Sequence, residues 1–319
     1  MKFYQESMRE TFGKTLVELG EKYNELIVLD ADLFTSTMTL YFKERFPNRF
    51  IQCGVAEGNM FGIASGLASL GFTTVPTTFA SFAVRKALDQ IYMNICYPNL
   101  NVKIPGLYSG FTASKNGPSH NLVEDIPIMR SLPNIRIIAP GDNIELRSFM
   151  FEMMEYEGPV YFRVPRIEVP TLFDDDYIFK WGKGYILKKG KKISLVSTGI
   201  MTSVVLKTSE LLEKEGIDAE VVHIASIKPI DEEIIVKTAR TTRCIFTIED
   251  GRIQGGFGSA VIEVVNKYYP VPVYQIGFDD EFVKSASIRE IMEGYGLTPV
   301  KIAKRILKHI NCDDKAKNY

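Results

Sequence analysis

One carboxylate in this sequence stands where an open α/β sheet would hold its ligands. Glu57 follows a short apolar run that begins at Phe50, in the stretch FIQCGVAEGNM, and it opens a predicted helix over 57–70. Ligands of open α/β sheets bind at the carboxyl ends of the strands. An acid in the first turn of a helix is also common, because it offsets the positive end of the helix dipole. Glu57 therefore becomes a candidate catalytic residue only if other functional side chains gather beside it.

Further functional side chains follow the ends of the other strands predicted in the first half of the chain. They are Asp30, Asp32, Ser36, Phe79, Phe82, Asn116, Ser119, His120, Arg163 and Arg166. Because parallel strands end at one edge of a sheet, we expect these side chains to lie close together. Phe79 and Phe82 would also suit a core, and Arg166 would suit an exposed surface. His120, in a Gly-Pro-Ser loop, is harder to explain by packing.

Several familiar ligand-binding patterns are absent from the sequence. There is no Gly-x-Gly-x-x-Gly after a strand, no GxxxxGK[ST] loop and no Gly-x-Ser-x-Gly elbow. The three histidines, His120, His223 and His309, are far apart, and no Cys-x-x-Cys pair occurs. We therefore predict no metal site built by this chain.

Strands and helices alternate along the chain, which predicts mostly parallel sheets covered by helices on both faces. The predicted strands are 27–29, 50–55, 72–77, 102–107, 135–139, 160–164, 193–197, 219–224, 243–248 and 272–276. The predicted helices are 5–20, 57–70, 80–96, 121–132, 142–156, 201–215, 231–240, 257–268 and 298–310. We predict an α/β fold of two doubly wound domains, 1–170 and 186–319, joined by a linker over 171–185.

The helix predicted after Glu57 has almost no side-chain bulk on one face. Gly58, Gly62 and Gly66 recur at every fourth residue, with alanine and serine among the residues between them. Each glycine inside a helix costs about 1 kcal/mol relative to alanine. Three at this spacing indicate that another backbone packs closely against this face.

The composition is that of a globular protein without a strongly charged partner. The chain of 319 residues is 45% hydrophobic, with a net charge of −1 and a mean hydropathy of −0.01. No charged block indicates nucleic-acid binding, and no apolar stretch approaches the ~20 residues of a membrane span. The start, MKFYQESMRE, has no apolar signal region, and the scattered cysteines favour reduced thiols. We therefore expect a cytoplasmic protein that binds neither nucleic acid nor membrane.

At these residues the chain resembles the transketolase family over nearly its whole length. In the first domain the resemblance lies in VLDADL (28–33), GVAEGNM (54–60), TTFASFAVRKALDQI (77–91), YPNLNVKI (97–104), NGPSH (116–120), EDIPIMRSLPNIRIIAPGD (124–142) and EGPVYFRVPR (157–166). In the second it lies in IKPID (227–231) and TIEDGRIQGGFGSAV (247–261). It implies a pyrimidine-binding domain of thiamine diphosphate enzymes followed by the transketolase C-terminal domain. The implied activity is transfer of a two-carbon ketol unit between sugars or sugar phosphates.

The resemblance implies how the cofactor would be held. Glu57 would hydrogen-bond N1′ of the aminopyrimidine of thiamine diphosphate. Phe82 would stack on that ring, and Phe79 would line its pocket. Asp32 and Leu33 would border the thiazolium. The cofactor would supply the carbanion chemistry, while the protein binds and orients it.

Substrate contacts are implied in the same way. The implied substrate-binding residues are Arg9, Ser36, Tyr108, Asn116, His120 and Arg166. His120 would be catalytic with Glu57, and Arg9 and Arg166 would hold a phosphate through charge-assisted contacts. Tyr108 replaces a histidine of the family, and Asn116 replaces an acid, so we expect an acceptor or donor sugar that differs from the family's usual ones.

The resemblance also implies a second polypeptide. The family's diphosphate-binding domain, with its Gly-Asp-Gly and Asn ligands for Mg²⁺, is missing, and Gly141-Asp142-Asn143 does not supply them. A separate N-terminal subunit would bring the magnesium and diphosphate site, in an α2β2 assembly with the active site shared. Two alternatives stay open. One is another thiamine diphosphate half, either deoxyxylulose-phosphate-synthase-like or 2-oxoacid dehydrogenase β-like; the other is a non-catalytic partner module.

Overall fold

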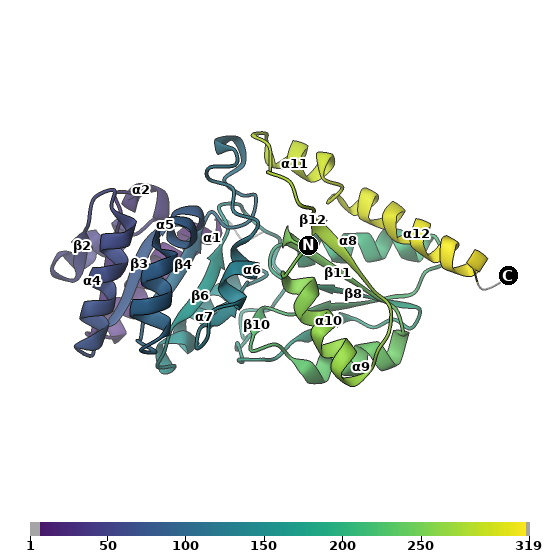
Figure 1. Ribbon diagram of the computed structural model, residues 1–319, viewed down its shortest axis with the longest axis horizontal. Coiled ribbons are helices and arrows are strands. Elements are labelled where there is room, and N and C mark those ends of the chain that lie inside the picture. The colour runs from purple at the N-terminus through teal and green to yellow at the C-terminus, as the bar shows by residue number, and fades with distance from the viewer. Residues whose placement is uncertain (1–6, 317–319) are drawn as a thin grey trace.

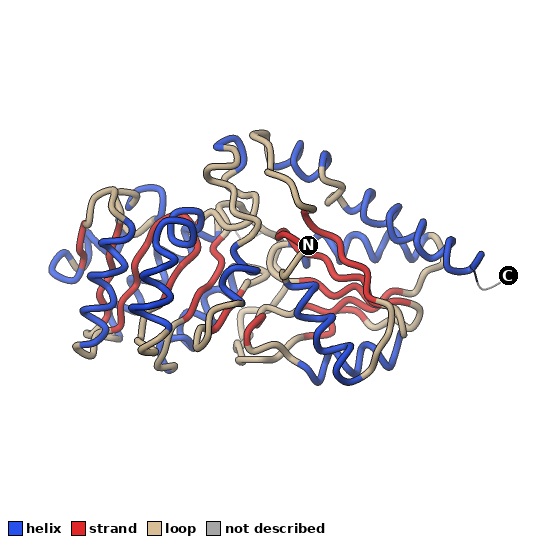
Figure 2. The backbone as a smooth tube through the Cα atoms, viewed as in Figure 1, coloured by secondary structure: helices blue, strands red, loops and turns tan. Residues whose placement is uncertain are grey.

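Two α/β units lie side by side along the long axis of the molecule (Figure 1). The computed structural model describes the backbone of residues 7–316 and the side chains of residues 7–310. The start of the predicted first domain, residue 1, and the end of the predicted second domain, residue 319, lie outside these residues. In each unit a sheet lies between layers of helices (Figure 2). The predicted fold class, two mostly parallel α/β sheets, is confirmed.

The first unit contains a seven-stranded sheet in the order β10-β5-β6-β4-β3-β1-β2. Its strands are β1 (Leu26–Asp30), β2 (Phe50–Gln52), β3 (Thr73–Phe79), β4 (Lys103–Leu107), β5 (Arg136–Ile138), β6 (Val160–Val164) and β10 (Ser226–Lys228). Every pair is parallel except β10 with β5. The central strands β3, β4 and β6 are buried along their whole length because helices cover both faces.

The helices of the first unit form two layers. On one face lie α1 (Met8–Lys22) and α7 (Asn143–Glu152). On the other lie α4 (Glu57–Ser69), α5 (Ala80–Gln90) and α6 (Asp125–Arg130). Two short helices, α2 (Phe34–Thr37) and α3 (Leu40–Arg45), follow β1. Helices α4 and α5 start directly at the sheet edge that carries the predicted site residues.

The second unit contains a five-stranded sheet in the order β12-β11-β8-β9-β7. Its strands are β7 (Tyr185–Lys188), β8 (Ile193–Ser197), β9 (Ala219–His223), β11 (Ile245–Arg252) and β12 (Val273–Phe278), of which β7 alone is antiparallel to its neighbour. Helices α8 (Met201–Lys214) and α12 (Pro299–Ala316) cover one face, and α9 (Glu232–Thr242) and α10 (Phe257–Tyr268) cover the other. The short helix α11 (Ile288–Gly294) precedes α12.

Several elements differ from the sequence prediction. The helix predicted over 80–96 is regular only to Gln90, and residues 91–96 wind as a π-helix. The helix predicted over 121–132 is shortened to α6, because residues 117–124 form a loop. The sequence analysis missed β7, β10, α2, α3 and α11, which are too short to carry a clear hydrophobic period. Of these, β10 has the largest effect on the fold, since it pairs with β5 of the first sheet although it lies in the second half of the chain.

A buried ionic cluster joins the two units. Arg163 of β6 pairs with Asp125 of α6 and places Nη1 2.6 Å from Oδ1 of Asp250, which lies on β11 of the second unit. None of these three side chains is more than 2% exposed. Gly110 packs against the Asp250 carboxylate so closely that a Cβ there would collide with it. The cluster therefore fixes the loop after β4 against the second unit.

Candidate active site

Three aromatic rings and an imidazole meet at the carboxyl edge of the first sheet. Phe79 ends β3, Phe82 lies in the first turn of α5, and Tyr108 follows β4. The ring centroid of Phe79 lies 4.2 Å from that of Tyr108 and 5.8 Å from that of Phe82. The His120 ring lies 5.1 Å from Phe82 and 6.0 Å from Phe79. At these distances aromatic rings are in contact, so we call the four residues the ring cluster.

Two arginines lie beside Tyr108. Arg9 of α1 donates from Nη1 to the Tyr108 hydroxyl at 2.8 Å and to the backbone oxygen of Ser36 at 3.2 Å. The Arg166 guanidinium lies 5.1 Å from the centre of the Tyr108 ring. Among the described residues, Nε of Arg9 is buried without a hydrogen-bond partner. The structure thus gathers two positive charges and a spare donor at one end of the ring cluster, and Ser36 contributes its carbonyl oxygen there.

Glu57 lies at the other end of the ring cluster. It is the first residue of α4 and is only 4% exposed, with its carboxylate 3.6 Å from Nζ of Lys86. The same ammonium lies 4.8 Å from the centre of the Phe82 ring. Glu57, Lys86 and Phe82 are therefore neighbours, and the positive end of the α4 dipole favours a negative charge at this point.

The loop after β1 separates two acids that looked alike in sequence. Asp30 is fully buried and accepts hydrogen bonds from the backbone N–H of Leu33 and from two threonine hydroxyls, while burial raises its pKa. Asp32 is exposed in a left-handed conformation with φ of 64°, and its N–H donates to the side chain of Gln52. Asp30 therefore holds the loop in shape, whereas Asp32 lies on its surface and Leu33 is half-buried against the core.

The loop of residues 109–121 places its polar residues unequally. Asn116 lies exposed on a turn of 3-10 helix, and its carbonyl accepts a hydrogen bond from Ser119 at 3.5 Å. Ser119 also places its hydroxyl 2.9 Å from Nδ1 of His120. The second unit supports the loop, since Ser114 donates to the backbone oxygen of Ala286 at 3.1 Å. His120 belongs to the ring cluster, and Asn116 stands at the outer rim.

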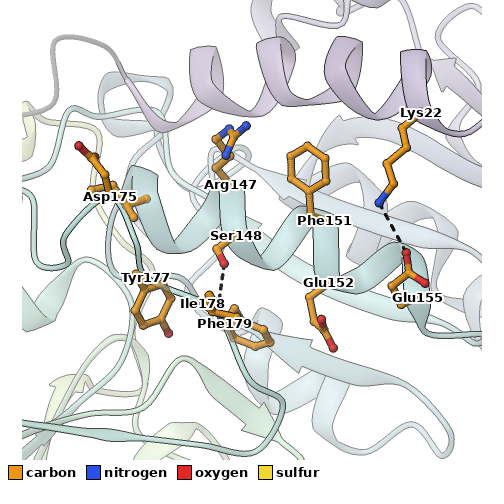
Figure 3. A pocket seen from close by; sticks show the side chains of 11 residues that line it. Lys22, Arg147, Ser148, Phe151, Glu152, Glu155, Asp175, Tyr177, Ile178 and Phe179 are labelled. Atoms are coloured by element: carbon orange, nitrogen blue, oxygen red, sulfur yellow. Dashed lines mark hydrogen bonds and ion pairs between the residues drawn. The ribbon is translucent and has the colours of Figure 1, made fainter.

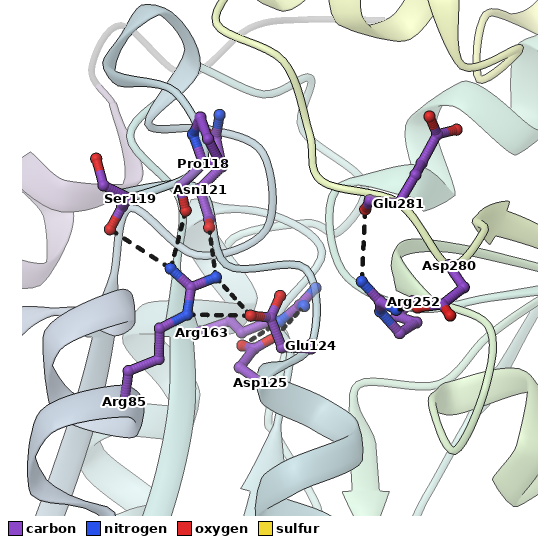
Figure 4. A network of polar contacts seen from close by, with 10 residues as sticks. All are labelled: Arg85, Pro118, Ser119, Asn121, Glu124, Asp125, Arg163, Arg252, Asp280 and Glu281. Carbon is purple, nitrogen blue, oxygen red and sulfur yellow. Dashed lines mark hydrogen bonds and ion pairs between the residues drawn. The ribbon is translucent and has the colours of Figure 1, made fainter.

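Sequence reasoning missed two cations of α5. Lys86 faces Glu57, and Arg85 binds the loop that carries His120 (Figure 4). A signal was available, because Lys86 follows Phe82 by four residues and so shares its helical face. Arg85 has no such signal, since its partners lie more than thirty residues further along the chain.

Some buried hydroxyls that lie close to the ring cluster in the sequence have no hydrogen-bond partner among the described residues. Among the described residues, the hydroxyls of Thr78, Ser81 and Ser109 are buried and accept or donate no hydrogen bond. Thr78 and Ser81 lie beside Phe79 in sequence, and Ser109 follows Tyr108. Unsatisfied buried polar groups are uncommon in folded proteins, and an ordered water, an ion, strain or a functional role commonly explains them. An aromatic wall with a buried acid at one end suits a polar aromatic ligand.

A separate cavity of about 510 Å³ lies away from this edge, between α1, α7 and the segment around Tyr177 (Figure 3). Several of its polar side chains already have partners within the chain. Lys22 lies 3.9 Å from Glu155, and the Ser148 hydroxyl accepts from the N–H of Phe179 at 2.9 Å. No predicted site residue lines this cavity.

The glycine face of α4 is open. A Cβ at Gly62 or Gly66 would meet no atom of the described residues within 4 Å. Large apolar side chains stand exposed nearby, with Leu70 at 76% and Tyr97 at 78%. The close backbone approach predicted for this face is therefore not made by the described residues.

Comparison with known proteins assigns the family. Residues 5–171 match the family model of the transketolase pyrimidine-binding domain, and residues 182–302 match that of the transketolase C-terminal domain. The chain belongs to the transketolase family. The family implies dependence on thiamine diphosphate and a transferase-type reaction.

Some similar proteins are matched over nearly their whole length. A protein of Methanocaldococcus jannaschii named as a transketolase C-terminal section is 42% identical, over 95% of this chain and 96% of its own length. A 6-deoxy-6-sulfo-D-fructose transketolase subunit of a Clostridium species is 34% identical, over 100% of this chain and 98% of its own. A solved structure described as a split gene transketolase, inactive beta4 tetramer, has a TM-score of 0.89 at 42% identity, covering 95% of this chain and 98% of that one.

Two other kinds of feature are absent from the described residues. They contain no group of three or more His, Cys, Asp or Glu side chains placed to hold a metal ion. None of their helices is both long and apolar enough to cross a membrane.

Proposed function

We propose that this chain is one subunit of a split transketolase that depends on thiamine diphosphate and magnesium. It would transfer a two-carbon ketol unit between phosphorylated sugars. One observation carries the proposal. A buried carboxylate, an aromatic wall and a pair of arginines follow one another in space along one edge of the sheet. That order suits a cofactor ring at one end and an anionic substrate group at the other.

The residues present fit the cofactor that the family implies. Phe82 would stack on the pyrimidine, Phe79 would line its pocket, and Asp32 and Leu33 would border the thiazolium. When bound, thiamine diphosphate supplies the carbanion chemistry. Glu57, nearly buried at the start of α4, would hold a proton between its carboxyl oxygen and the N1′ ring nitrogen. Its burial excludes the water that would otherwise compete for that hydrogen bond.

The substrate would lie on the other side of the ring cluster. Ser119 engages Nδ1 of His120, which leaves Nε2 for a substrate oxygen. Arg9 and Arg166 would bind the phosphate, with Ser36 completing the pocket, because two guanidinium groups provide several charge-assisted donors to one anion. The Tyr108 hydroxyl accepts from Arg9 and so keeps its own proton to donate to the sugar. Asn116 would contact the sugar from the rim.

A partner subunit would complete the site. We propose that an N-terminal transketolase subunit brings the magnesium and diphosphate ligands, in an α2β2 assembly in the cytoplasm. The names of the relatives support this, since chains of the same extent are called a C-terminal section and a subunit. The open glycine face of α4 also supports it, because Gly62 and Gly66, which no other described residue packs against, are explained by a second chain packing there.

Reconstitution tests the proposal. The chain alone is expected to bind thiamine diphosphate at least about tenfold more weakly than its mixture with an N-terminal subunit and Mg²⁺, because it lacks the oxygen ligands of the metal. Calorimetry measures this difference, and a panel of ketose phosphate donors and aldose acceptors measures transfer. Tight magnesium-dependent binding by the chain alone would refute the split. A fully bound complex that transfers no ketol unit in the panel would refute the reaction.

Loss of the Arg166 guanidinium should weaken phosphorylated substrates selectively. A hydrogen bond to a charged group contributes about 1.5–3 kcal/mol, so Arg166→Ala is expected to raise KM for a phosphorylated donor by roughly 10–100-fold. KM for the matching sugar without phosphate should stay unchanged. Steady-state kinetics on both sugars measure the difference. The control is Arg45→Ala, which should change neither value, since Arg45 is an exposed residue of α3 paired with Glu21 of α1. Equal losses for both sugars would contradict the phosphate assignment.

A further inference from the structure

The side chain of Arg85 hydrogen-bonds the backbone on both sides of His120 (Figure 4). Its Nη1 donates to the carbonyl oxygens of Pro118 at 2.9 Å and Ser119 at 3.5 Å. Its Nη2 donates to the carbonyl oxygen of Asn121 at 3.1 Å. One rigid guanidinium therefore spans the four-residue segment that holds the imidazole.

Glu124 holds the guanidinium from the other side. Nε of Arg85 donates to Oε1 of Glu124 at 3.0 Å, and Nη2 contacts the same oxygen. The two side chains are 32% and 24% exposed, so the pair is half-buried beneath the loop. The carboxylate offsets the positive charge of Arg85. The effect of the guanidinium on the loop is therefore mainly geometric, as a planar set of donors in fixed directions.

Helix α5, which carries Arg85, also carries the ring that His120 contacts. Arg85 and Phe82 both belong to α5, and the His120 ring lies 5.1 Å from the Phe82 ring in an edge-on orientation. Asn121 bonds the backbone of Ser114 at 2.8 and 3.1 Å, which ties the loop to itself but not to α5. Arg85 thus links the loop directly to the helix that carries Phe82.

We propose that Arg85 is a positioning residue, which sets the imidazole of His120 against the Phe82 ring at the separation that catalysis requires. This inference rests on the proposed function, in which His120 contacts the substrate. Lysine cannot replace Arg85, because one ammonium group cannot reach the carbonyls of Pro118 and Asn121 and the Glu124 carboxylate together. Glutamine at position 124 keeps an acceptor for Nε and should therefore be tolerated better than a change at Arg85.

Kinetics of the reconstituted enzyme test whether Arg85 acts through His120. Arg85→Ala and Arg85→Lys are each expected to lower kcat/KM by roughly 10–100-fold, since a displacement of about 1 Å can cost that much. Glu124→Gln should cost clearly less. In the His120→Ala background, Arg85→Ala should cause no further loss, because residues that act as a unit are not additive. Losses that multiply, or full activity in Arg85→Lys, would overturn the proposal.

Hydrogen exchange tests the same idea without turnover. In Arg85→Ala the amides of residues 114–124 should exchange faster, while those of β9 should not change. The matched control is Arg147→Ala, which removes an arginine 2.6 Å from Glu18 on another face and should leave loop exchange as it is. Unchanged exchange in the loop of Arg85→Ala would refute the positioning role whatever the enzyme does. Faster exchange with no transfer by the wild type would instead refute only the proposed function.

Discussion

Glu57→Gln is expected to lower kcat of the reconstituted enzyme by about 10²–10⁴-fold, the range for loss of a proton-transferring group. Glutamine has nearly the same shape as glutamate and can still form one hydrogen bond. It cannot share a proton with the ring nitrogen of the cofactor, because its amide neither accepts nor releases a proton near neutral pH. The measurement is kcat at saturating thiamine diphosphate, Mg²⁺ and both sugars.

The variant should fold normally, which separates the catalytic effect from a loss of structure. The ion pair that Glu57 makes joins it to Lys86, whose side chain is 54% exposed, and pairs of this kind contribute little to stability. Glu290→Gln is the matched control, since Glu290 also lies in the first turn of a helix but is exposed in the second unit. Near wild-type kcat in Glu57→Gln would remove Glu57 from the mechanism, and with it the main support for the proposed function.

Arg163→Met is expected to lower the free energy of unfolding by about 3–5 kcal/mol, the cost of breaking a buried ion pair from one side. Arg163 is the cation between Asp125 and Asp250. Burial raises the pKa of Asp250 and raises that of Glu249 to about 7, while Arg163 lowers both. Without Arg163, up to three acids would be buried with less compensation. Guanidinium unfolding of the whole chain, followed by circular dichroism, measures the loss.

Two comparisons isolate the ionic cluster from general packing. Adding Asp250→Asn to Arg163→Met removes one of the uncompensated acids, so the double variant should lose less stability than the two single losses added together. Arg240→Met changes an exposed arginine of α9 and should alter the free energy of unfolding by no more than about 0.5 kcal/mol. A loss below about 1 kcal/mol in Arg163→Met would show that the cluster does not hold the two units together.

The layered architecture could be predicted because it depends on local patterns of apolar and polar residues. The strand β8 and the helix α10 have the predicted bounds, 193–197 and 257–268. Short apolar runs separated by amphipathic stretches leave few arrangements other than a parallel sheet between helices. The topological rule that parallel strands end at one edge then predicts that Glu57, Phe79 and His120 lie on the same side of the sheet.

The contacts within the candidate site could not be predicted in the same way. Arg9 and Tyr108 are 99 residues apart, and nothing local to either specifies that they meet. Asp30 and Asp32 are alike in the sequence, but Asp30 is buried and hydrogen-bonded, whereas Asp32 is exposed. Their different roles follow from how the loop folds over β1.

The alternation of strands and helices, the edge at which functional residues collect and the family signature all follow from local sequence patterns. The packing of the whole chain sets which side chains touch. It put Lys86 beside Glu57, Arg85 beneath the loop of His120, and β10 on the sheet of the other unit. The physical reason is range: periodicity and strand ends depend on residues a few positions apart, whereas a charge finds its partner only after the whole chain has packed.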